Sequence, residues 1–289
     1  MQSQLTRAAK PTATYEVRGG DGLRLHAREW GLAEGPELLL IHGWSQSDLC
    51  WSKQVDSELA SRFRIVSFDL RGHGLSEKPS GAEHYADARL WADDVAAVIE
   101  ATRLERPTLV AWSYGGFVVT DYLRAYGDDG IAAIDLVGAA VILNPPAFDH
   151  IGPGFLENAN DACESDLATN IAAIHRFVRA CTAEALDEPE WTAALCWNMA
   201  VPAGVRGALI SREIDGCDAL AHVSVPVLVT HGREDSIILP SMAEHALGRC
   251  ETAVASWYEG VGHMPFWEAA DRFDAELAEL CDRAGASTP

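Results

Sequence analysis

Short apolar runs that end in glycine or in a polar residue are the feature that most constrains the fold of this chain. They span residues 37–41, 65–68, 108–112, 131–143 and 225–230. Strands without polar interruptions are covered on both faces, as in a parallel sheet. Between them, apolar residues recur with a helical period, for example at Trp91, Val95, Val98 and Ile99 and at Phe266, Phe273, Leu277 and Leu280. Alternating strands and helices predict an α/β chain with a doubly wound, mostly parallel sheet.

One long segment interrupts this alternation. Residues 148–222 contain only helical patterns, and so long a stretch without structure of its own is rare in a compact domain. We therefore predict a core of residues 15–147 and 223–284, beginning with a hairpin at 15–30, a small helical cap or lid at 148–222, and flexible tails at 1–14 and 285–289. Because ligands bind beyond the carboxyl ends of parallel strands, such a cap would lie over the binding edge of the sheet.

Composition narrows the classes of function. The 289 residues are 48% hydrophobic, and 22 Lys and Arg against 43 Asp and Glu give a net charge of −21. The hydrophobic share is typical of a packed globular protein, and acidic charge without a basic stripe disfavours nucleic acid as a partner. No run of 18 apolar residues occurs, so no membrane span is predicted. The chain gives no indication of its oligomeric state.

The cysteines and the short motifs bear on redox state and cofactors. Seven cysteines are widely spaced and lack a C-x-x-C pair, which favours reduced thiols and a cytoplasmic location. No metal-ligand spacing, Walker loop or G-x-G-x-x-G pattern occurs. We therefore predict chemistry without a metal or a cofactor.

Residues 112–116, Trp-Ser-Tyr-Gly-Gly, are the clearest candidate for a reactive site. A serine that directly follows an apolar strand and precedes a helix sits on a sharp turn, which exposes its hydroxyl. The nucleophile-elbow pattern is G-x-S-x-G, and Ala111 stands here in place of the first glycine. Ser113 is therefore the predicted nucleophile, and the competing interpretation is a turn without chemistry.

A serine hydroxyl needs a histidine as base and a carboxylate that orients this histidine. Asp235 follows the apolar run 225–230, and His263 follows the predicted strand 254–258. The order Ser113, Asp235, His263 is the one found in nucleophile-elbow hydrolases, and all three residues lie just beyond strand ends. The neighbouring Glu234 is a rival acid, and Asp149 and Asn144 mark a more remote acid site.

Taken together, these motifs resemble those of the α/β-hydrolase superfamily over residues 15–284. The resemblance is carried by residues 42–44 (His-Gly-Trp), 69–74 (Asp-Leu-Arg-Gly-His-Gly), 113–116, 232–235 and 262–263. It implies an eight-stranded, mostly parallel sheet with a helical cap. Within this superfamily the sequence most resembles small bacterial esterases and cofactor-free, non-haem haloperoxidase-like serine hydrolases. This resemblance rests on residues 42–44 followed by Trp51, and on the compact cap.

The resemblance also implies an oxyanion hole formed by the backbone N–H groups of Trp44 and Tyr114. We interpret His42 as a residue that holds this loop through a hydrogen bond rather than as a base. Residues 69–74 resemble a strand-end turn in which Asp69 and Arg71 are structural hydrogen-bond partners. Resemblance places the catalytic acid at Asp235 rather than at Glu234.

Aromatic side chains gather near the motifs and in the cap, and such side chains line apolar ligand pockets. The residues that we predict to contact substrate are Trp44, Trp112, Tyr114, Phe148, Trp191, Trp197 and Met264. Trp44 and Tyr114 are the strongest candidates, because their backbone positions adjoin the nucleophile.

The sequence therefore predicts a serine hydrolase that cleaves a small, mainly apolar carboxylic ester or lactone through an acyl-enzyme on Ser113. The same triad would also serve acyl transfer, perhydrolysis, C–C bond hydrolysis, or cyclisation or lactonisation of a natural product. A non-catalytic ligand-binding protein is a further possibility. A serine at the elbow argues against haloalkane dehalogenases and epoxide hydrolases, which resemblance says use an aspartate there.

Overall fold

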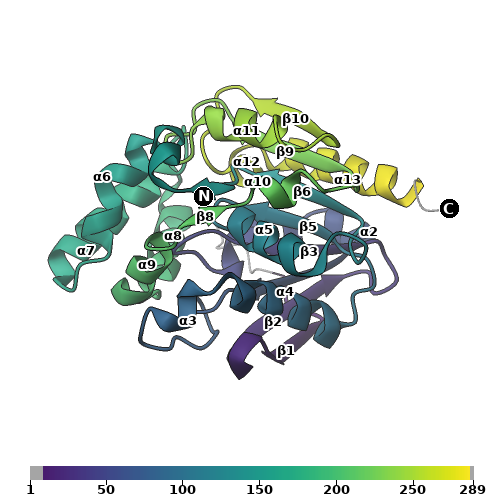
Figure 1. Cartoon of the computed structure of the whole chain (residues 1–289), viewed down its shortest axis with the longest axis horizontal. Coiled ribbons are helices and arrows are strands. Elements are labelled where there is room, and N and C mark those ends of the chain that lie inside the picture. Colours follow the sequence, from purple (N-terminus) through teal and green to yellow (C-terminus); the bar gives the residue numbers. More distant parts are fainter. Residues whose placement is uncertain (1–8, 287–289) are drawn as a thin grey trace, which may run out of the picture.

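Eight strands form one sheet in the order β1-β2-β4-β3-β5-β6-β9-β10 in the computed structural model, which describes residues 9–286 (Figure 1). The strands are β1 (Ala13–Arg18), β2 (Arg24–Gly31), β3 (Glu37–Ile41), β4 (Arg64–Asp69), β5 (Thr108–Trp112), β6 (Ala133–Val137), β9 (Val227–Gly232) and β10 (Ala253–Tyr258). β2 pairs antiparallel with both β1 and β4, and all other pairs in this sheet are parallel. The predicted doubly wound, mostly parallel, eight-stranded α/β fold is confirmed.

Helices cover both faces of this sheet. Figure 1 shows α4 (Ala88–Thr102) and α5 (Gly115–Tyr126) in front of the strands and α13 (Ala270–Ala286) behind them. The sequence explains α4 well: the Asp87 side chain accepts a hydrogen bond from the Arg89 N–H at its start, and the stripe of Trp91, Val95 and Val98 is buried. The short helices of the core are α1 (Ser52–Val55), α2 (Leu59–Arg62), α3 (Glu83–Ala86), α10 (Cys217–Leu220), α11 (Pro240–Leu247) and α12 (Pro265–Glu268).

The apolar run 131–143 differs from the single strand that its composition predicts. β6 ends at Val137, and Gly138 turns the chain with a φ of +48°. A second sheet of two strands follows, in which β7 (Ile142–Leu143) pairs with β8 (Ile214–Asp215). A Cβ atom at Gly138 would lie 3.1 Å from His263 Nδ1, so glycine both permits the turn and leaves room for this histidine.

The segment between β7 and β8 contains α6 (Pro153–Ala162), α7 (Leu167–Ala180), α8 (Glu188–Met199) and α9 (Ala203–Ile210), and we call these four helices the cap. Figure 1 shows them grouped at one end of the molecule. Within the described residues, no single helix is long and apolar enough to cross a membrane, and α8 with α9 reaches that length only as a pair bent by 80°.

Most residues of the two predicted tails lie outside the part of the chain that the structure describes. Residues 1–8 and 287–289 lie outside the described residues. Ala13 and Thr14, which the sequence pattern places in the N-terminal tail, belong to β1, where they pair with Glu29 and Arg28 of β2. α13 likewise extends to Ala286, beyond the predicted end of the core.

Candidate active site

Ser113 occupies the sharp turn between β5 and α5. Its φ is +57°, a left-handed conformation that a residue with a side chain rarely adopts. The glycines that follow are required by close packing, since a Cβ at Gly115 would lie 2.8 Å from the Ile41 carbonyl oxygen and one at Gly116 2.5 Å from that of Ala140. The Ser113 N–H donates to the Val137 carbonyl (3.0 Å), which fixes the turn against β6. This geometry matches the elbow predicted from residues 112–116.

Asp235 and His263 lie side by side at the same edge of the sheet. His263 Nδ1 is 2.7 Å from Asp235 Oδ2, and the other carboxylate oxygen accepts the N–H groups of Ile237 (2.8 Å) and Ile238 (2.9 Å). Both side chains are buried. A carboxylate at this distance keeps the proton on Nδ1, which leaves Nε2 as the basic nitrogen.

The loop that carries His263 is fixed from both sides. Below it, the indole N–H of Trp112 donates to the His263 carbonyl (2.9 Å). On the cap side, the His263 N–H donates to the Cys181 carbonyl (2.9 Å), and Glu268 accepts the N–H groups of Gly262 and Ala183 (2.9 and 2.7 Å). The histidine is thereby held by the core and by the residues that follow α7.

The rival acid Glu234 points elsewhere. Its side chain is exposed, and Oε1 accepts the N–H of Gly260 at 3.3 Å. Asp149, at the more remote acid site, is also exposed. Of these three acids, Asp235 is the one that the structure brings to His263.

The loop after β3 passes directly over Ser113. A Cβ at Gly43 would lie 2.8 Å from the Ser113 Cβ, so the backbone of this loop touches the serine. Within residues 9–286, the N–H groups of Trp44 and Tyr114 have no hydrogen-bond partner. Two unpaired donors beside a serine are the arrangement that an oxyanion hole requires.

Two buried histidines hold this loop in place. His42 Nε2 accepts the Leu70 N–H (3.0 Å), and burial lowers the pKa of His42 to about 4, so the ring is neutral. His73 Nε2 accepts the N–H of Ser45 (3.2 Å), while its Nδ1 donates to the Arg71 carbonyl (2.9 Å). These contacts agree with the loop-holding role inferred for His42.

The turn at residues 69–74 is built on buried ionic groups. Asp69 accepts the N–H groups of Asp48 (2.9 Å) and Leu75 (2.8 Å). Arg71 binds Asp94 through two hydrogen bonds of 2.7 and 2.8 Å. Both side chains therefore act as structural partners, which agrees with the interpretation from the sequence.

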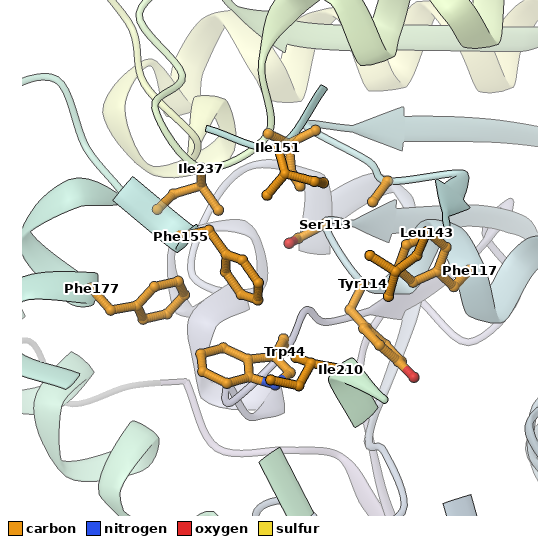
Figure 2. A pocket seen from close by; sticks show the side chains of 12 residues that line it. Trp44, Ser113, Tyr114, Phe117, Leu143, Ile151, Phe155, Phe177, Ile210 and Ile237 are labelled. Atoms are coloured by element: carbon orange, nitrogen blue, oxygen red, sulfur yellow. The ribbon is translucent and has the colours of Figure 1, made fainter. Parts of the chain in front are cut away.

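A pocket that is partly open to solvent has Ser113 in its wall (Figure 2). It is lined by Trp44, Ser113, Tyr114, Phe117, Ala140, Leu143, Ile151, Phe155, Phe177, Ile210, Ile237 and Ile238. Figure 2 shows Trp44, Phe155 and Phe177 on one side of Ser113, and Tyr114, Phe117 and Leu143 on the other. The rings of Phe155 and Phe177 pack edge to face against the Trp44 ring, with distances between ring centroids of 5.2 and 5.1 Å. No charged side chain contributes to this lining.

Trp44 and Tyr114 are the two predicted pocket residues that the structure places in the lining. The other five lie elsewhere: Trp112 is buried beneath His263, Phe148 is half exposed, Trp191 packs against His175, the Trp197 indole donates to Gln46, and Met264 is buried before α12. The sequence does not predict most of the apolar residues that line the pocket. Ile237 and Ile238 could have been found, because they directly follow the turn that carries Asp235.

Comparisons with known proteins identify the family of this chain. Residues 38–276 match the model of the alpha/beta hydrolase family. A solved structure of a proposed aryl esterase from Burkholderia cenocepacia is 34% identical, with 95% of this chain and 100% of that chain covered and a TM-score of 0.90. A bifunctional esterase/perhydrolase from Acinetobacter calcoaceticus is 28% identical over 75% of this chain and 81% of its own length.

A non-heme chloroperoxidase from Streptomyces lividans is 28% identical over 86% of this chain and 92% of its own length. The family model covers well over half of the chain, and the relatives are similar along most of their lengths. This chain therefore belongs to the alpha/beta hydrolase family, close to small bacterial esterases.

Proposed function

We propose that this protein hydrolyses a small, mainly apolar carboxylic ester or lactone through an acyl-enzyme on Ser113. The observation that carries the proposal is one edge of the sheet where a strained serine, a His263–Asp235 pair at 2.7 Å and two unpaired N–H groups surround an apolar pocket. The esterase names of the Burkholderia and Acinetobacter relatives support the same class of reaction.

In this mechanism the Ser113 hydroxyl attacks the carbonyl carbon and its proton passes to His263 Nε2. The negative charge on the carbonyl oxygen is stabilised by the N–H groups of Trp44 and Tyr114. Collapse of this intermediate breaks the ester bond, and the leaving alkoxide takes the proton from His263. Water then attacks the acyl-enzyme, gives its proton to His263, and the acid leaves as that proton returns to Ser113. Asp235 keeps the imidazole in the required tautomer throughout.

The lining of the pocket supports a narrower substrate class. Every lining side chain apart from Ser113 is apolar or aromatic, so a charged acyl group would lose its hydration without gaining a partner. An uncharged aliphatic or aryl acyl group fits such walls. The aryl esterase assignment of the Burkholderia relative supports aryl esters as the first substrates to examine.

A second candidate is transfer of the acyl group to hydrogen peroxide. The acyl-enzyme is the same, and peroxide replaces water as the attacking nucleophile, so the product is a peracid. The name of the Acinetobacter relative, a bifunctional esterase/perhydrolase, favours this reaction over C–C bond hydrolysis and over cyclisation.

The first experiment combines labelling by a fluorophosphonate with peptide mass spectrometry and a panel of p-nitrophenyl and phenyl esters. We expect one adduct, on Ser113, and turnover that Ser113→Ala lowers by about four orders of magnitude or more. Ser67→Ala, at another buried serine, is the matched control and is expected to retain activity. A folded protein that forms no adduct, or a Ser113→Ala variant that still hydrolyses esters, would contradict the proposal. Added hydrogen peroxide tests the second candidate through peracid formation.

A further inference from the structure

One helix of the cap contacts both Trp44 and Tyr114, the two residues proposed to form the oxyanion hole. The indole N–H of Trp44 donates to the Arg206 carbonyl (3.1 Å). The Tyr114 hydroxyl donates to the Leu209 carbonyl (3.5 Å). Both carbonyls belong to α9, and Ile210 at its end lines the pocket with Trp44 and Tyr114 (Figure 2). α9 therefore bridges the loop after β3 and the turn after β5.

A buried arginine strengthens the first of these contacts. Arg206 is 1% exposed, and its Nε donates to the Ser45 hydroxyl at 2.9 Å. Its other nitrogens bind the carbonyls of Ala162 (2.7 Å) and Asn198 (2.9 Å) and the side chain of Asn170 (3.0 Å). In the described part of the chain, no carboxylate forms an ion pair with it. Burial lowers the pKa of Arg206 to about 10.

Such a cation is costly to bury, so we ask what its contacts stabilise. One of these contacts is with Ser45. This residue follows Trp44 directly and has a φ of +61°, a strained value for a serine. Strained residues persist where their neighbours over-determine them. Arg206 holds the Ser45 hydroxyl, and His73 holds its N–H at 3.2 Å.

A second buried arginine, Arg212, contacts Tyr114. Arg212, just after α9, donates to the Tyr114 hydroxyl (3.0 Å) and to Asp121 Oδ2 (2.6 Å). Its guanidinium also lies over the ring of Trp91, at 5.2 Å from the centroid. Burial opposes its charge, but Tyr114 and Asp121 outweigh burial and raise the pKa of Arg212. Asp121 lies on α5, the helix that Ser113 and Tyr114 introduce.

We propose that α9 is a clamp that sets the separation of the Trp44 and Tyr114 N–H groups, with Arg206 and Arg212 as positioning residues of the oxyanion hole. The inference rests on the proposed function of Ser113. A tetrahedral oxyanion needs both donors within about 2.7 to 3.1 Å, so a small shift of either loop weakens the transition state more than the ground state. Neither arginine lines the pocket, so neither is a substrate contact.

The test compares two inhibitors on Arg206→Met and Arg212→Met. An aryl trifluoromethyl ketone adds to Ser113 and places its oxyanion between the two N–H groups, whereas the matching secondary alcohol only fills the pocket. We expect each variant to weaken the ketone about 10- to 100-fold, to lower kcat/KM by a similar factor, and to leave the affinity for the alcohol unchanged.

Arg64→Met is the matched control. Arg64 is also largely buried and pairs with Glu29 and Glu37, but it lies at the start of β4, away from the strand ends that carry Ser113. We expect it to leave both inhibitor affinities unchanged. Equal weakening of ketone and alcohol, an unchanged ketone affinity, or the same ketone loss in Arg64→Met would each overturn the clamp.

Two further variants protect the test against misfolding of the arginine variants. Ser45→Ala and Tyr114→Phe remove the side-chain partners of Arg206 and Arg212 while both backbone N–H groups remain. We expect the same selective loss of the ketone. Adding Arg212→Met to Tyr114→Phe should increase this loss little, because Tyr114→Phe already removes the hydroxyl that Arg212 and the Leu209 carbonyl bind. Wild type that is not labelled at Ser113 would refute the proposed function itself. Active wild type with variants that behave like Arg64→Met would refute only the clamp.

Discussion

The edge of the sheet and the cap contribute different parts of the candidate site. The edge supplies the groups proposed to react: Ser113 follows β5, Asp235 follows β9 and His263 follows β10. The cap supplies walls, such as Phe155 and Phe177, and hydrogen bonds that hold the edge in place. Changes at the edge should affect turnover of every substrate, whereas changes in the cap walls should affect the choice of substrate.

The largest effect on turnover, after loss of the nucleophile, is expected from Asp235→Asn. An amide can no longer hold the proton on His263 Nδ1, so the imidazole adopts the wrong tautomer, and kcat should fall by about 10⁴-fold for every ester. Glu234→Gln, at the exposed neighbour, should change kcat less than about threefold. Steady-state kinetics on two esters of different size measures both variants. A large loss in Glu234→Gln would move the acid to that residue.

Gly43→Ala should cost about 100-fold in kcat/KM. The added Cβ would lie 2.8 Å from the Ser113 Cβ, so the loop that carries Trp44 must move away from the serine. Gly204→Ala is the matched change in the cap, where a Cβ meets nothing within 4 Å, and its activity should equal that of wild type. Comparable activities for the two alanine variants would show that close approach of the loop to Ser113 is not required.

The reacting residues at the edge can be predicted from the sequence because local sequence patterns determine their positions. Each reacting residue directly follows an apolar run, and parallel strands bring their carboxyl ends together, so positions along the chain translate into one site. Gly43 and Gly116 likewise mark places where backbone must approach closely. The break at Gly138 cannot be predicted in this way, because residues 131–143 are largely apolar and a glycine within such a run gives no sign of its φ.

The cap is harder to predict, because its contacts depend on how helices pack over the sheet. Phe177 and Trp191 both lie on cap helices, yet only Phe177 faces the pocket, and neither periodicity nor composition distinguishes them. Arg206 and Arg212 resemble ordinary surface cations in the sequence, although both are buried. Trp112 adjoins Ser113 in the sequence and so suggests a pocket residue, but neighbours along a strand point to opposite faces.

Phe155→Ala and Phe177→Ala test the cap side of the comparison. Each change removes an aromatic wall from one side of Ser113, so we expect a shift of about tenfold in kcat/KM in favour of longer or branched acyl groups over acetate. Turnover of acetate esters should change little, since the groups at the edge are untouched. Phe148→Ala, at a half-exposed residue outside the lining, is the control and should leave the selectivity unchanged. An unaltered chain-length profile in both pocket variants would place the acyl group elsewhere.

The smallest effect on activity is expected from Asp135→Asn, deep in the sheet on β6. Asp135 is fully buried, accepts the Thr230 hydroxyl (2.8 Å) through Oδ1 and has no partner for Oδ2 among residues 9–286. Burial raises the pKa of Asp135 to about 8, whereas an unfolded aspartate titrates near 4. The folded state therefore keeps a proton that the unfolded state has lost, and this contribution to stability declines as pH rises from about 4 to about 8.

Asparagine is neutral at every pH and can still accept the Thr230 hydroxyl, so the variant should lack this decline. We expect its Tm relative to wild type to increase from pH 5 to pH 8 and then to stay constant, with ester turnover unchanged at pH 7. Asp129→Asn, at an exposed aspartate, controls for the change in net charge and should show no such trend. A Tm difference independent of pH would mean that Asp135 is ionised in the folded protein. A fall in turnover would mean that the interior of the sheet, and not only its edge, determines the geometry around Ser113.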